Sequence, residues 1–184
     1  IWQKELAGIN DEQTIFFDTK YAYVFLAGAF QELTPAATWD GADWNLFLAT
    51  NYRGVTPDVR LFFVTNFVNT ALNPMRYRNG GAWTDFFPIV SGTVAGASAI
   101  FLTQAKILIP YFGRLLALNV WETPQDAGGA PDYGASTNIY NRCRFSKLGD
   151  PTDQTNGWRS DVFGLGGFID APTAESIVSA TFFK

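Results

Sequence analysis

Short apolar runs, separated by turn residues, recur along most of the chain. Residues 14–17 and 21–26 flank the polar segment 18–20, and Gly28 follows the second run. This arrangement is typical of a β-hairpin. The spacing of apolar positions therefore predicts strands rather than helices at the start of the chain.

The same pattern continues to the far end. The run 59–65 is apolar almost throughout, which indicates a strand buried on both faces. Residues 75–78 alternate apolar and charged, as a half-exposed strand does, and Asn79-Gly80 supplies the turn after them. Helical periodicity is confined to one short turn expected within 95–105. Further strands are predicted at 44–49, 82–87, 106–109, 114–120, 139–146 and 176–183, and loops at 123–137 and 149–161.

A possible internal repeat sets the expected architecture. Asp40-Gly41, Trp44 and Phe47 recur as Asn79-Gly80, Trp83 and Phe86, an offset of 79 − 40 = 39 residues. Four short strands in about 40 residues make one blade of a β-propeller. The fold class predicted is all-β and propeller-like, as a single region over 1–184, with candidate blades at about 14–50, 59–90, 105–146 and, in part, 166–184. A β-sandwich or jelly roll is the alternative, because it also spaces short strands every 8 to 12 residues.

Composition and charge limit the classes of partner that the protein is expected to bind. The chain has 184 residues, 47% of them hydrophobic, and a net charge of -4 with a pI of about 4.7. This acidic balance argues against direct nucleic-acid binding, which relies on Lys and Arg. No apolar run is long enough to span a membrane. The chain starts at Ile1 and ends at Lys184 within an expected strand, so we expect a fragment of a longer polypeptide.

Catalytic chemistry finds little support in the residue types. The chain has no histidine and one cysteine, Cys143, which removes His-based triads and His-based metal sites. We therefore expect no enzyme, and no catalytic, metal or cofactor-binding residue. Asp150 and Asp153 could form a glycosidase pair, or calcium ligands, but the interpretation preferred here is turn capping. Asp161 and Asp170 lie in the same glycine-rich segment, and the glycines of 164–168 are expected to relieve backbone crowding rather than to bind phosphate.

Tryptophans and arginines are the candidates for contacts. Trp44 and Trp83 occupy the repeated position, so a structural role is expected for both. The arginines alternate with apolar residues and are expected on the solvent side of strands: Arg76, Arg78, Arg142, Arg144 and Arg159. The sharper hypothesis is a contact with a neighbouring subunit, since Arg and Trp are favoured in interfaces. The possible interface residues are Arg142, Arg144, Trp121 and Trp158.

The segment 139–153 reads Ile-Tyr-Asn-Arg-Cys-Arg-Phe-Ser-Lys-Leu-Gly-Asp-Pro-Thr-Asp. It resembles a sequence motif in structural proteins of tailed bacteriophages. In that motif, an Asn-Arg-x-Arg-aromatic-Ser run precedes Gly-Asp-Pro, an acidic residue and usually a Trp. A Gly-x-Ile-Asp segment then follows, as at 167–170, and the resemblance extends over about 59–184. Gln154 stands in the place of that Trp, with Trp158 as a possible substitute.

The resemblance implies a propeller-like tail or tail-attachment component, located in the virion after assembly in the host cytoplasm. Its partners would be copies of itself and neighbouring virion proteins, held by protein–protein contacts. No catalytic residues come with the resemblance. The alternative function is a carbohydrate-binding module for receptor recognition or particle decoration, with a glycan as its partner.

Overall fold

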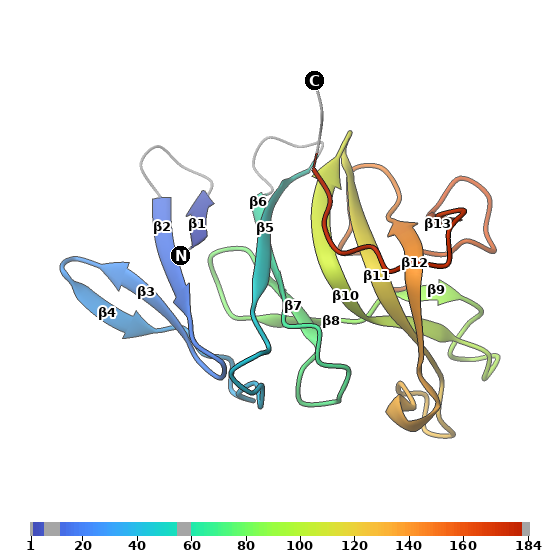
Figure 1. Ribbon diagram of the computed structural model, residues 1–184, viewed down its shortest axis with the longest axis horizontal. Helices are drawn as coiled ribbons and strands as arrows, with labels where there is room; N and C mark the ends of the chain where they lie inside the picture. The colour runs from blue at the N-terminus through green and yellow to red at the C-terminus, as the bar shows by residue number, and fades with distance from the viewer. Residues whose placement is uncertain (1, 6–11, 55–59, 182–184) are drawn as a thin grey trace.

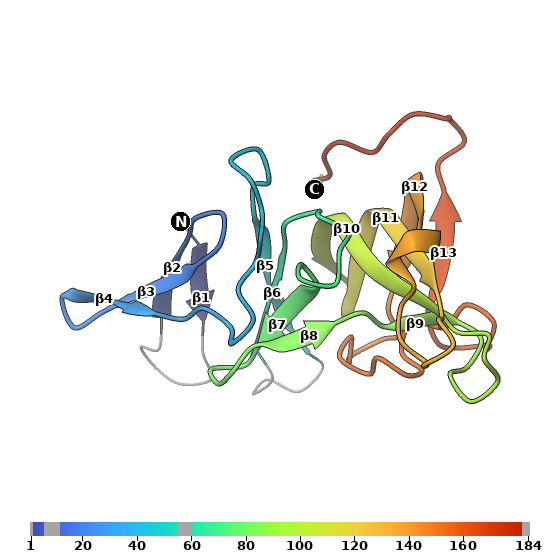
Figure 2. The ribbon, with the colours of Figure 1, turned by 90° about the horizontal axis from the view of Figure 1, so that it is seen from below.

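A computed structural model describes residues 2–5, 12–54 and 60–181. In these residues the protein is all-β, as predicted, with three antiparallel sheets and one short 3-10 turn at Tyr133–Ala135. Figure 1 shows the three sheets beside one another in chain order, and the view from below in Figure 2 shows the same order. None of the described residues forms a long apolar helix of the kind that crosses a lipid bilayer.

Each sheet is a meander, in which strands that follow one another in sequence lie next to one another. The first sheet comprises β1 (Trp2–Glu5), β2 (Glu12–Phe17), β3 (Ala22–Leu26) and β4 (Ala29–Glu32). The second comprises β5 (Leu48–Arg53), β6 (Arg60–Thr65), β7 (Met75–Arg78) and β8 (Thr84–Phe86). The third comprises β9 (Ile89–Ser91), β10 (Ile100–Tyr111), β11 (Arg114–Pro124), β12 (Thr137–Phe145) and β13 (Gly167–Asp170).

The second sheet is covered on both faces. Successive side chains of a strand point to opposite faces, so β6 contributes to two cores at once. Phe63 packs with buried residues of the third sheet, whereas Phe62 and Val64 pack with Ile15 of the first. Leu61 to Thr65 are all buried, which confirms the prediction for this strand; Val59 lies outside the described residues.

The predicted hairpin over 14–26 is confirmed, and the strands predicted at 106–109 and 114–120 pair as a second hairpin. Strands β2 and β3 pair across the Asp18 turn, where the carboxylate accepts hydrogen bonds from the backbone N–H groups of Lys20 and Tyr21. Strands β10 and β11 pair over nearly their whole length and turn at Phe112-Gly113. Both turn residues have positive φ, 43° and 72°, a conformation that glycine adopts at little cost.

Three predictions of local structure are wrong. The segment 95–105 holds no α-helix: it turns at 94–97 and enters β10 at Ile100, because this strand pairs with β11 and fills the core. Of residues 44–49, Leu48 and Ala49 alone belong to a strand. Residues 176–181 are not a strand, and Phe182 and Phe183 lie outside the described residues.

The segment after β13 instead crosses the third sheet, as the red trace in Figure 1 shows. The backbone N–H of Ala171 donates to the carbonyl of Asn141, and that of Ile177 donates to the carbonyl of Tyr140. The Asn119 side chain donates to the Ile177 carbonyl at 3.1 Å. Separate contacts, rather than a continuous ladder of backbone hydrogen bonds, thus hold this segment against the sheet.

Candidate functional site

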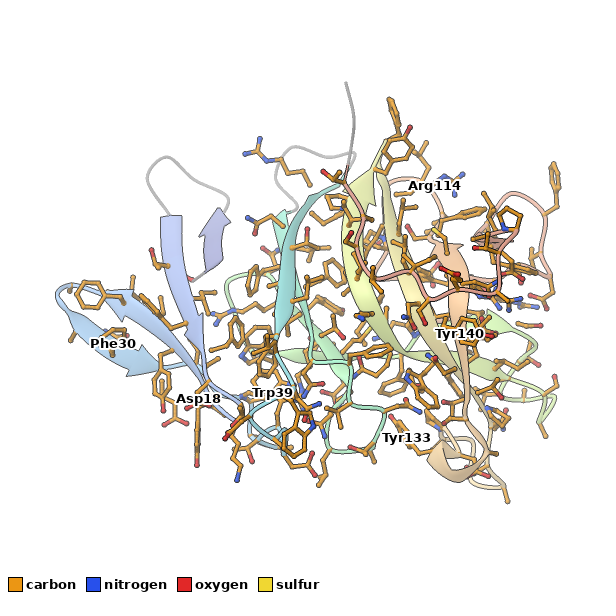
Figure 3. The ribbon with its side chains drawn as sticks, in the orientation of Figure 1. Asp18, Phe30, Trp39, Arg114, Tyr133 and Tyr140 are labelled. Carbon is orange, nitrogen blue, oxygen red and sulfur yellow. The ribbon has the colours of Figure 1, made fainter. Side chains whose placement is uncertain are left out.

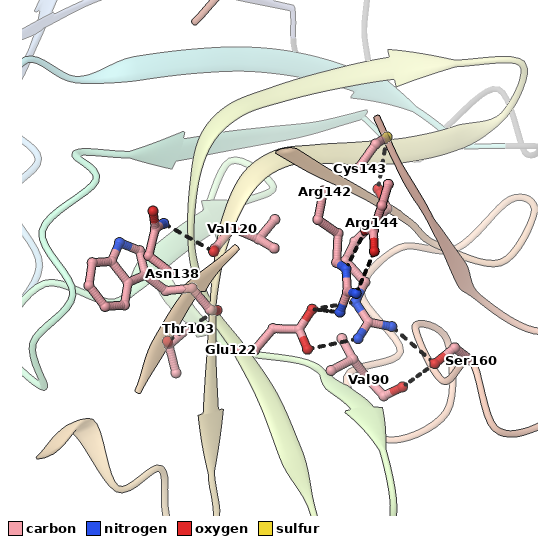
Figure 4. A network of polar contacts seen from close by, with 11 residues as sticks. Val90, Thr103, Val120, Glu122, Asn138, Arg142, Cys143, Arg144 and Ser160 are labelled. Atoms are coloured by element: carbon pink, nitrogen blue, oxygen red, sulfur yellow. Dashed lines mark hydrogen bonds and ion pairs between the residues drawn. The ribbon is translucent and has the colours of Figure 1, made fainter. Parts of the chain in front are cut away.

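Arg142 and Arg144, two of the predicted interface residues, lie on β12 and converge on one carboxylate of β11 (Figure 4). The Nε and Nη2 atoms of Arg144 donate to the two oxygens of Glu122, both at 2.8 Å. Arg142 donates from Nη1 to Glu122 at 3.1 Å. It also donates two hydrogen bonds to the carboxylate of Asp170 on β13, of 2.7 and 2.8 Å.

The aromatic ring of Phe168 completes this cluster. The guanidinium carbons of Arg142 and Arg144 lie 4.0 and 4.7 Å from the ring centre, within the range of cation–π attraction. Two positive and two negative groups balance each other. The hydrogen bond with Arg142, together with the positive charge of both arginines, outweighs desolvation and lowers the pKa of Asp170.

These contacts mainly hold β11, β12 and β13 together, and little of the cluster is exposed as a surface for a partner. Arg144 is 3% exposed, so the prediction that it lies on the solvent side is wrong. Its third contact, from Nη1 to the Ser160 hydroxyl, holds the 149–166 loop to the sheet. The outward part of the cluster consists of Phe168 and Asp170, which are both exposed.

The two tryptophans of the predicted interface lie in different places. Trp158 is fully buried, donates from its indole to the Pro151 carbonyl at 2.8 Å, and meets Phe86 edge-on. It is therefore a core residue rather than a surface anchor. Trp121 lies half-buried on β11, so some of its surface remains accessible.

Arg76 and Arg78 also differ from the prediction. Both are buried, at 2% and 4% exposure, because the second sheet is covered on both faces. Arg76 pairs with Asp85 at 2.7 Å and lies over the Trp39 ring. Arg159 is only partly buried, and it pairs with Asp161 through two hydrogen bonds.

The four late aspartates cap turns and pair with cations. Asp150 accepts hydrogen bonds from the backbone N–H and hydroxyl of Thr152, which supports the capping interpretation. The hydrogen bonds from Arg159 lower the pKa of Asp161 to about 2. Burial alone would raise the pKa of Asp153, but its bonds from Lys147 and Asn156 lower it overall. A glycosidase needs one carboxyl with a raised pKa, whereas the pKa values of Asp153 and Asp161 are lowered.

The glycine-rich segment 164–168 makes close backbone contacts. A side chain on Gly166 would collide with the backbone of Trp158, and one on Gly167 would collide with the Phe145 ring. These glycines allow β13 to approach the core. Within the described residues, no three acidic or cysteine side chains lie close enough together to hold a metal ion.

The first sheet carries a surface that the sequence reasoning missed. We call it the outer aromatic face: Phe16, Tyr23, Phe25 and Phe30, on the side turned away from the second sheet. The Phe30 ring lies 5.1 Å from both Phe16 and Phe25, edge-on. Phe30 is 63% exposed and Phe25 is 46% exposed. Figure 3 shows Phe30 at the far end of the sheet, whereas Trp39 lies on the side of the second sheet.

A signal for this face exists in the sequence. In β2, Phe16 stands between Ile15 and Phe17, which both pack toward the second sheet. A period of two therefore puts Phe16 on the opposite side. Trp44, by contrast, was expected to be structural like Trp83, and that prediction is wrong: Trp44 is 82% exposed in a turn, whereas Trp83 packs against the core.

Two hollows lie along the junction of the first and second sheets. One, of about 570 Å³, is bounded by the Asp18 turn and by residues 43–47. The other, of about 340 Å³, lies between residues 32–36 and the turn after β7, and Arg78 and Trp83 line it. Both are open to solvent rather than enclosed.

Comparison with known proteins gives no relative. No family model matches the chain, and no match was found among curated proteins or solved structures. What the geometry defines is an all-β protein of three stacked antiparallel sheets with an uncovered aromatic face at one end.

Proposed function

We propose that this protein is a structural component that assembles through protein–protein contacts, with copies of itself as the first partner. The observation that carries the proposal is the outer aromatic face. The Phe30 ring contacts those of Phe16 and Phe25, and both Phe25 and Phe30 are exposed. Clusters of exposed aromatic side chains mark interaction sites on soluble proteins.

The way in which the sheets pack within the chain indicates what kind of partner would bind the outer aromatic face. The junction of the first and second sheets is filled by stacked and edge-on rings, including Phe17, Phe47 and Phe62. The outer aromatic face has the same chemistry on the opposite side of the same sheet. Another sheet with an aromatic face is therefore the best match, and a second copy supplies such a sheet.

The propeller-like architecture belongs to this proposal. Four-stranded meanders that stack face to face in chain order are the units of a propeller. A sandwich has two sheets, each with one face toward solvent, whereas the second sheet here is buried on both faces. This supports a stack that continues beyond the first sheet.

A tailed-phage tail or tail-attachment component is the particular setting we propose, on the strength of the resemblance in 139–153 and 167–170. Assembly of many copies is what such a component does. The contacts of Arg142 and Arg144 with Glu122 give this segment a structural role, because they hold β12 to β11.

The test is the mass of the protein in solution, measured by light scattering over a range of concentrations. We expect the wild-type chain to form oligomers, and Phe30→Asp to weaken association about tenfold or more, since a charge in an apolar contact is costly. Phe163→Asp is the matched control, because Phe163 is fully exposed on a loop. Oligomers that form rings or tubes by electron microscopy would support the phage setting.

A wild-type chain that stays monomeric at every concentration would contradict the proposal, as would equal effects of the two substitutions. A monomer would favour the second candidate, glycan binding. One observation favours that candidate: Tyr23 on the outer aromatic face pairs across the strands with Glu32, so a ring and a carboxylate lie side by side. Desolvation, together with the charges of Asp18 and Glu32, raises the pKa of Tyr23. A glycan screen in which Phe30→Asp abolishes binding would then decide.

A further inference from the structure

A buried arginine at the junction of the first and second sheets lacks an acidic partner. Arg78, the last residue of β7, is 4% exposed. Its Nη2 donates to the Gly80 carbonyl at 2.9 Å, and its Nε, also buried, has no hydrogen-bond partner. Its guanidinium carbon lies 5.5 Å from the centre of the Trp83 ring.

Other buried arginines in the described part of the chain have an acidic partner. Arg76 pairs with Asp85, although its own buried Nη1 also lacks a hydrogen-bond partner, and Arg144 pairs with both oxygens of Glu122. Burying a cation without a counter-ion costs several kcal/mol, so buried charges in proteins are normally paired. Burial accordingly lowers the pKa of the Arg78 guanidinium from its usual value. The site is short of one negative charge.

Space for that charge exists beside the residue. The hollow of about 340 Å³ that Arg78 lines is also bounded by Trp83, Pro35 and Thr34. Trp83 and Pro35 give it apolar walls, and Glu32 stands among its lining residues. Apolar walls with a few charged or polar groups are the usual form of a small-molecule site.

We propose that this hollow binds the carboxylate group of a small acidic ligand, with Arg78 as the anchoring residue. The guanidinium fork matches the two oxygens of a carboxylate. A single negative charge is the best fit, because a dianion such as phosphate would carry a second charge close to Glu32. This site is separate from the outer aromatic face and does not depend on the proposed assembly.

The experiment is a titration of the full-length chain with sodium acetate, followed by nuclear magnetic resonance of the arginine Nε–H and tryptophan Nε1–H groups. Sodium chloride at equal ionic strength is the control. We expect saturable shifts of the Arg78 and Trp83 signals, with Arg159 unmoved because Asp161 already holds it. Phosphate should shift the same signals more weakly.

Two substitutions sharpen the test. Arg78→Met should weaken acetate binding at least about tenfold, the loss expected for a charge-assisted hydrogen bond. Glu32→Gln, at an exposed position, should tighten it by removing a like charge. If Arg78→Met does not fold, the shifts in the wild type and in Glu32→Gln still decide.

Absence of a saturable shift at Arg78 would overturn the proposal. So would a loss of stability in Glu32→Gln that disappears when Arg78 is also replaced, because Glu32 would then be the counter-ion of Arg78.

Discussion

Cys143 shows how the surroundings of one residue decide its chemistry. It lies on β12, partly buried, between the two arginines of the Glu122 cluster. Desolvation nevertheless raises the pKa of its thiol to about 11. The thiolate is the reactive form of cysteine, so a raised pKa makes the side chain inert near neutral pH. The raised pKa favours a structural role for this partly buried side chain rather than a role as a nucleophile.

We expect Cys143 in the folded protein to react with a thiol reagent about a hundredfold more slowly at pH 8 than in denaturant, where its pKa returns to about 8.5. The folded-state rate should then rise with pH up to about 11, because the thiolate fraction grows until the pH passes the pKa. Cys143→Ser is a complete control, since the chain has one cysteine. Equal rates in the folded and unfolded chains would contradict the expectation.

Residue-scale predictions from the sequence failed mostly for arginine. The alternation in 75–78 correctly predicts a strand, but it assigns Arg76 and Arg78 to solvent. That inference assumes that one face of the strand is exposed. The second sheet has no such face, because the first sheet covers one side and the third covers the other. Which sheets stack is set by long-range packing, which a local pattern does not contain.

At the scale of elements, the Glu122 cluster is the main polar link between β11, β12 and β13. Glu122 is 8% exposed and receives hydrogen bonds from two arginines. Removing the charge of a buried partner leaves the others uncompensated, which is much more costly than losing a surface pair.

We therefore expect Glu122→Gln to lower the free energy of unfolding by about 3 kcal/mol, because Arg144 would remain buried without its carboxylate. The exposed pair offers a matched control: Asp170→Asn should cost less than about 1 kcal/mol. Urea unfolding, followed by circular dichroism, measures both. If Glu122→Gln and Asp170→Asn lowered the free energy of unfolding equally, Glu122 would not be the main link between these strands.

Elements were predicted best where the pattern was strongest. Hairpins with apolar strands and a polar or glycine turn, such as 14–26 and 106–120, appear as expected. Strand β4 was missed because Ala29-Phe30-Gln31-Glu32 is a short, fully exposed edge strand. The 39-residue echo does not mark equivalent places: Asn79-Gly80 follows β7 within the second sheet, whereas Asp40-Gly41 lies between two sheets. Many aromatic residues in a short chain make such coincidences common.

At the scale of the whole molecule, the stack raises the question of whether its sheets unfold together. Repeats that contact only their neighbours tend to have separable stabilities. Strand β6 is the place to test this, because Phe62 and Phe63 are adjacent, equally buried at 0%, and point into different cores. The nearest candidate-site residues, including Trp83 and Arg78, lie on the Phe62 side.

We expect Phe62→Ala and Phe63→Ala each to cost about 3–5 kcal/mol, the usual loss for a buried Phe. The patterns of hydrogen exchange should differ, however. Phe62→Ala should speed exchange in β2 and β3 and leave β10 and β11 protected, because the core that it opens contains Ile15 and Ala22 but no residue of the third sheet. Phe63→Ala should instead speed exchange in β10 and β11, whose Leu108 and Leu115 share its core. Phe163→Ala, at a fully exposed position, should change neither pattern.

If Phe62→Ala speeds exchange in β10 and β11 as much as in β2 and β3, the three sheets form one cooperative unit. Separate patterns would mean that each sheet junction is an independent contact.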